Sequence, residues 1–66
     1  MEYIITSLKG DKMTVVSRHQ DLNDAMKAGK TAWENAPKGT TISCIKGNIN
    51  EEGDVTGQYQ LYNCWF

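Results

Sequence analysis

A single stretch of the sequence has the apolar spacing of an amphipathic helix, and it lies between two pairs of strand-like segments. Its apolar or small residues recur at steps of three and four, which places them on one helical face. These residues are Leu22, Ala25, Met26, Gly29, Ala32, Trp33 and Ala36. Asp21 is a favourable N-cap, and Pro37 and Gly39 end the pattern. The sequence therefore predicts a helix over residues 21–36.

Gly29 lies in the middle of this predicted apolar face. Glycine there costs about 1 kcal/mol of helix stability relative to alanine. Because a bare Cα lets another element come close, we expect the helix to pack tightly against a sheet at this position.

The first pair of strand-like segments predicts a β-hairpin over residues 3–18, with a two-residue turn at Gly10 and Asp11. Both segments are rich in isoleucine, valine and threonine, and glycine supplies the positive φ that such turns need. The expected pairs are Lys9–Lys12, Leu8–Met13, Thr6–Val15 and Ile4–Ser17.

The second pair predicts a hairpin over residues 40–66, with a polar turn at residues 50–54. The expected pairs are Ile49–Val55, Ile45–Tyr59, Ser43–Leu61 and Thr41–Asn63. Gly47 and Gly57 lie inside these strands, which indicates a bulge or a close backbone contact.

The predicted order of elements is β-β-α-β-β, and 66 residues allow one domain, residues 1–66. We therefore expect an α+β fold, in which two hairpins form a four-stranded antiparallel sheet and the helix packs on one face. No apolar run is long enough to span a membrane, and the N-terminus lacks the features of a signal peptide. These properties predict a cytoplasmic protein.

Neither a catalytic site nor a metal or cofactor site is expected. His19 is the only histidine, and Ser17 is too near in sequence to predict a catalytic pair. Cys44 and Cys64 have no metal-ligand spacing with His19. In the expected register the two cysteines share a sheet face about 13 Å apart, beyond disulfide reach, so both should be free thiols. The loop from residue 48 resembles a calcium-binding loop in part, but Tyr59 occupies the position of the bidentate glutamate, which favours a polar turn.

Both faces of the expected sheet are apolar, whereas one helix can cover only one of them. The uncovered face should therefore meet a partner. The candidate interface residues are Tyr3, Ile5, Val16, Ile42, Tyr62 and Phe66. Residues 59–66 are uncharged and aromatic, so we expect them at the centre of the sheet or paired across an interface.

A homodimer or another protein is the predicted partner, and the function is that of a non-enzymatic interaction module. The alternatives are a monomer whose aromatic rings cover its own sheet, and a surface that binds single-stranded nucleic acid. The basic and aromatic residues that could share such a surface are Tyr3, Lys9, Lys12, Arg18, Lys46, Tyr62 and Phe66. The net charge of −1 disfavours nucleic acid, since such binders are usually basic.

Overall fold

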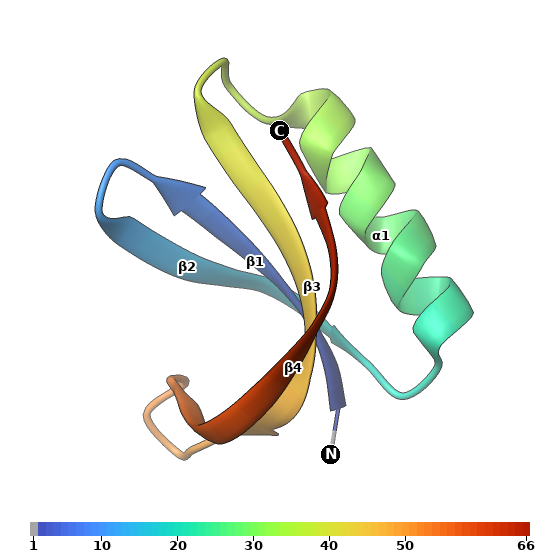
Figure 1. The fold of residues 1–66 in the computed structure, drawn as a ribbon, viewed down its shortest axis with the longest axis vertical. Helices are drawn as coiled ribbons and strands as arrows, with labels where there is room; N and C mark the ends of the chain where they lie inside the picture. The colour runs from blue at the N-terminus through green and yellow to red at the C-terminus, as the bar shows by residue number, and fades with distance from the viewer. Residues whose placement is uncertain (1) are drawn as a thin grey trace.

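The computed structural model describes residues 2–66, which form one sheet and one helix (Figure 1). The elements are β1 (Glu2–Lys9), β2 (Lys12–His19), α1 (Leu22–Asn35), β3 (Thr40–Ile49) and β4 (Val55–Trp65). The strands pair antiparallel in the order β2-β1-β3-β4, and α1 joins the two hairpins across one face. The predicted α+β fold is confirmed.

The helix begins and ends where its capping residues predict. The Asp21 carboxylate accepts a hydrogen bond of 2.8 Å from the backbone N–H of Asn23. At the other end, Ala36 is extended, as a residue before proline prefers. The predicted range 21–36 exceeds the observed helix by these two capping residues.

The core lies between α1 and the two central strands. Ile5, Ile42 and Cys44 are buried from the sheet side, and Ala25 is buried from the helix side. A Cβ added to Gly29 would lie 2.5 Å from two ring carbons of Trp65. The expected close approach at this glycine is therefore confirmed.

The first hairpin keeps its predicted register near the turn and loses it farther away. Three expected pairs are confirmed, but Ile4 pairs with Arg18 rather than Ser17. The register shifts between Ile5 and Thr6, and Val16 is the extra residue on β2. A bulge of this kind bends its strand.

The second hairpin departs further from the expected register. Ile49–Val55 is confirmed, but Ile45 pairs with Leu61 and Ser43 with Cys64, so the other expected pairs are wrong. The register changes at two irregularities. Between the pairs Ile49–Val55 and Ile42–Trp65, β3 advances by seven residues and β4 by ten. The first irregularity lies at Gly47, and Gly57 opposite it has a φ of 67°. The expectation that these glycines mark an irregularity is confirmed.

The second irregularity lies at Tyr62, which is the extra residue between Leu61 and Asn63, and it exchanges the two faces of the last residues of β4. Trp65 pairs with buried Ile42 and packs beneath α1, whereas Cys64 pairs with Ser43 on the opposite face. Cys44 lies in the core under α1, so the two cysteines do not share a face as expected. Both are free thiols, which confirms that prediction. Burial raises the pKa of the Cys44 thiol.

The positions of the strands also correct one expectation about β4. It forms an edge of the sheet beside β3, and β1 and β3 are central. The apolar composition of residues 59–66 therefore does not reflect a central position. Pairing of this edge across an interface stays a prediction.

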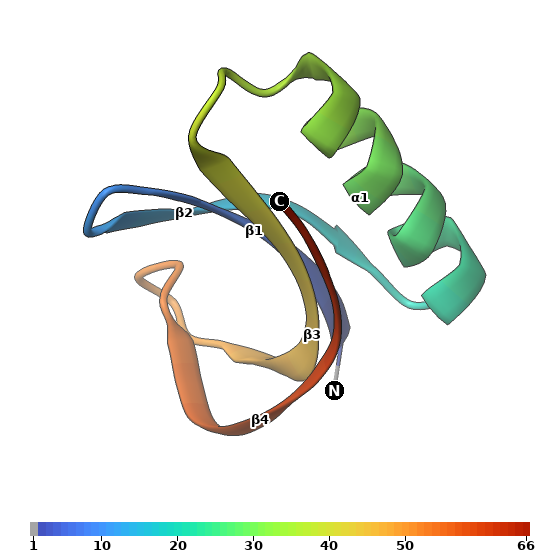
Figure 2. The ribbon, with the colours of Figure 1, turned by 45° about the horizontal axis from the view of Figure 1, so that its top comes forward.

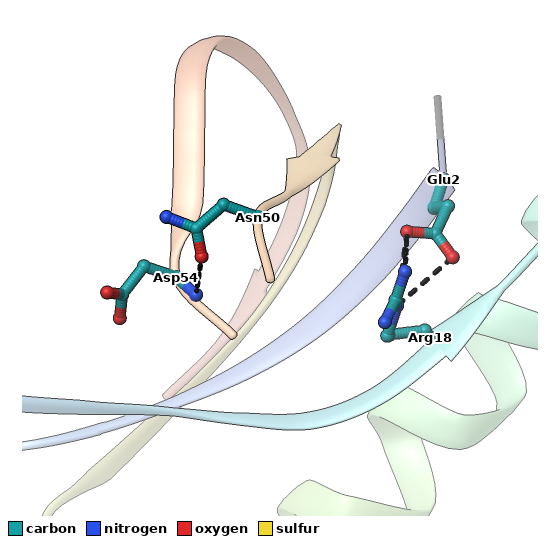
Figure 3. A network of polar contacts seen from close by, with 4 residues as sticks. All are labelled: Glu2, Arg18, Asn50 and Asp54. Carbon is teal, nitrogen blue, oxygen red and sulfur yellow. Dashed lines mark hydrogen bonds and ion pairs between the residues drawn. The ribbon is translucent and has the colours of Figure 1, made fainter. Parts of the chain in front are cut away.

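The sheet is strongly curved, and Figure 2 shows both hairpins bending toward each other on the side away from α1. The hairpin ends are held by polar contacts (Figure 3). Glu2 accepts hydrogen bonds from Arg18, with a shortest distance of 2.6 Å. The Asn50 side-chain oxygen accepts from the backbone N–H groups of Glu52 and Asp54 and closes the β3–β4 turn.

Candidate interaction surface

The face of the sheet opposite α1 is a concave apolar surface, which we call the open face. Its centre is a hollow of about 270 Å³. The lining residues come from all four strands and are Thr6, Leu8, Met13, Ser43, Ile45, Val55, Tyr59, Leu61 and Cys64. The bulges form this surface, because they bend both hairpins over the same side of the sheet.

The open face is buried along the central strands and exposed along the edge strands. Thr6 and Ile45 on the central strands are 4% and 5% exposed. Met13 on β2 is 56% exposed, whereas Tyr59 and Leu61 on β4 are 61% and 55% exposed. Exposed apolar side chains grouped around a concave surface are typical of a binding site.

The chemistry of the hollow is almost entirely apolar. No aspartate, glutamate, lysine, arginine or histidine is among its lining residues. The polar contact at its wall joins Ser43 Oγ and Cys64 Sγ at 3.6 Å. This surface therefore offers apolar area and few hydrogen bonds, which suits another protein surface better than a charged ligand.

The two sheet edges differ in charge. Edge strand β2 contains Lys12 and Arg18, whereas edge strand β4 contains no charged residue. The hydrogen bond and negative charge of Glu2 raise the pKa of Arg18. Charged side chains protect an edge from pairing with another chain, so β4 is the less protected edge.

Two of the predicted interface residues are core residues. Ile5 and Ile42 are 0% and 1% exposed beneath α1 and offer no surface to a partner, which corrects the prediction for them. Tyr3 packs against the same core. Its ring lies 5.6 Å from that of Tyr62, and Lys46 Nζ lies 5.5 Å from the Tyr3 ring centroid.

The other three are exposed but lie apart. Val16 is the bulged residue of edge strand β2, and Tyr62 lies on edge strand β4 at the opposite side of the sheet. Phe66 follows β4, where its backbone oxygen accepts a hydrogen bond of 2.8 Å from Trp33 Nε1. The structure therefore does not bring the six residues together. None of the six candidate residues lines the open-face hollow, because the sequence does not indicate which face of the sheet α1 covers.

The predicted basic and aromatic surface is also divided. Lys9 and Lys12 flank the β1–β2 turn, and Lys46 lies beside Tyr3. Arg18 pairs with Ile4, and its guanidinium is engaged by Glu2. Binding of single-stranded nucleic acid stays a prediction, which a salt-dependent mobility-shift assay would test.

The structure places Ser17 and His19 in contact, although their nearness in sequence did not predict a catalytic pair. His19 Nε2 lies 2.8 Å from Ser17 Oγ. Among residues 2–66, no carboxylate hydrogen-bonds the other ring nitrogen, so the pair lacks the third group of a hydrolase triad. Over the same residues, no group of three or more histidine, cysteine, aspartate or glutamate side chains could hold a metal ion.

No helix in the described part of the chain is long and apolar enough to cross a membrane. Comparisons with protein-family models, with curated proteins and with solved structures find no match to this chain.

Proposed function

We propose that this protein is a non-enzymatic interaction module that self-associates through edge strand β4 and its side of the open face. The exposed, uncharged β4 edge carries this proposal. Both cysteines are free, so we expect the protein to work in the reducing environment of the cytoplasm.

A second copy is the partner that this edge fits best. Two β4 strands can pair antiparallel about a two-fold axis, so that the same residues contribute from both sides. Such pairing satisfies backbone groups that an edge leaves unpaired. A two-fold axis perpendicular to the sheet would also make the two open faces continuous, because Tyr59 and Leu61, which line the open-face hollow, belong to β4.

The expected stabilisation can be estimated from Leu61. Burying a leucine side chain completely contributes about 1.5–3 kcal/mol, and Leu61 is still 55% exposed. Covering the remainder therefore contributes about 1 kcal/mol per copy, or about 2 kcal/mol per dimer. Losing it should weaken association about 30-fold.

Sedimentation velocity over a range of protein concentrations tests the proposal. We expect concentration-dependent dimers, and Leu61→Lys should weaken association at least about 30-fold while leaving the circular dichroism spectrum unchanged. Val16→Lys is the matched control, because Val16 is an aliphatic residue of similar exposure on the opposite edge. A wild-type monomer at several hundred micromolar would refute the proposal, and so would equal effects of both variants.

A further inference from the structure

A second hollow lies on the helix side of the sheet, where α1 has ended and the sheet continues toward the β1–β2 turn. Its volume is about 360 Å³. The residues that line it are Ser7, Lys9, Lys12, Thr14, Pro37 and Thr40. It is separate from the open face, and no residue lines both hollows.

The strand register places its polar side chains in two adjacent rows. Lys9 pairs with Lys12 on one side and with Thr40 on the other, so these three residues form a row across β2, β1 and β3. Ser7 and Thr14 pair with each other and form the next row on the same face. Cross-strand partners lie on the same side of a sheet, so two lysines and three hydroxyl-bearing residues border one hollow.

Lys9 and Lys12 are the charged residues that line this hollow, and Asp11 lies in the turn between them. Lys9 and Lys12 are direct cross-strand partners, and like charges in that position repel each other. No acidic residue is among the lining residues. Within residues 2–66, the ion pair that the structure shows joins Glu2 and Arg18, and neither lysine takes part in it.

An unsatisfied hydroxyl group is a second, independent indication. Thr40 is 7% exposed, and its Oγ1 is buried without a hydrogen-bond partner. Buried hydroxyl groups normally have a partner, and one left without calls for a specific explanation. Thr40 is itself a lining residue of the hollow, so the unpartnered hydroxyl belongs to the residues that border this space.

We propose that this hollow binds a tetrahedral oxyanion of the phosphate type, free or as the phosphoryl group of a larger molecule. The ammonium groups of Lys9 and Lys12 supply charge-assisted hydrogen bonds to its oxygens. The hydroxyl groups of Ser7 and Thr14 add neutral donors, and the anion removes the repulsion between the two lysines. The hollow also leaves space for the group that carries a phosphoryl ester.

Amide NMR titrations with inorganic phosphate and with O-phosphoserine, at constant ionic strength, test the proposal. We expect saturable shifts at residues 7, 9, 12, 14 and 40. Lys9→Gln and Lys12→Gln should each raise the dissociation constant about 10-fold, because each removes a charged donor. Lys27→Gln and Lys30→Gln on the exposed side of α1 are the matched controls and should leave it unchanged.

The outcomes separate the sources of the anion and can overturn the proposal. Tighter binding of O-phosphoserine indicates a phosphorylated ligand, and equal binding of both probes indicates the free anion. Shifts that do not saturate, or that all four lysine variants reduce equally, would show general charge screening and refute the site.

Discussion

Replacing Gly29 with alanine tests how closely α1 packs on the sheet. At an exposed helix position this change stabilises a protein by about 1 kcal/mol. Here the new Cβ would lie 2.5 Å from two Trp65 ring carbons and 3.2 Å from Ile5 Cδ1. Favourable carbon contacts need about 3.5–4.0 Å, so the ring must move by about 1 Å.

The cost of that movement exceeds the gain in helix propensity. Overpacking a core costs about 1–3 kcal/mol, so we expect Gly29→Ala to lower the free energy of unfolding by about 1 kcal/mol. In a domain of this size such a loss lowers Tm by about 4–8 °C. Urea denaturation followed by circular dichroism measures both the sign and the size of the change.

A double variant identifies the contact responsible. When Trp65→Leu removes the ring, Gly29→Ala should become stabilising by up to about 1 kcal/mol, because only the propensity gain remains. Lys30→Ala, at an exposed position of α1, controls for general effects and should change stability by less than about 0.5 kcal/mol. A Gly29→Ala variant that is more stable than the wild type would refute the close approach of α1 to Trp65.

Four further outcomes follow from single side chains. Thr40→Val should raise the free energy of unfolding by about 1 kcal/mol in urea, since it removes an unsatisfied buried hydroxyl; a loss would mean that Oγ1 has a partner. Asn50→Ala should lower it by about 1 kcal/mol by removing two hydrogen bonds that close the β3–β4 turn, and an unchanged urea midpoint would contradict this. A disulfide reagent should modify Cys64 at least about 100-fold faster than Cys44, whose reaction requires local opening; equal rates would contradict its burial. Burial raises the pKa of the Cys44 thiol in the folded chain, so the unfolded chain loses this proton at a lower pH than the folded chain does. The free energy of unfolding should therefore fall as pH rises above about 8.5. Cys44→Val should weaken that pH dependence.

The sequence predicted the elements because each has a strong local signal. The helix was evident from its apolar spacing and from Asp21 and Pro37 at its ends. The predicted strand register of the first hairpin was correct near its turn, since a two-residue turn determines the pairs beside it. These signals act over a few residues and were sufficient for the fold class.

The surface could not be predicted to the same extent, because it depends on strand irregularities. Gly47 and Gly57 indicated one of them, but nothing in the composition around Tyr62 marks the other. A one-residue shift exchanges the faces of every later residue, so the prediction that Cys44 and Cys64 share a face was wrong. The choice of face covered by α1 also depends on curvature, which is a property of the whole sheet.

The irregularity at Tyr62 restricts how β4 can change in length. Before it, odd-numbered residues such as Leu61 face the open side, and after it the even-numbered Cys64 does. Deleting Tyr62 would remove the extra residue and leave Trp65 paired with Ile42 beneath α1, so the face of the ring would not change. Deleting a second residue from the same segment would place Trp65 opposite Ser43 on the open face and leave the gap beside Gly29 unfilled. A small deletion library should therefore give folded protein for one deletion in this segment and much less for two.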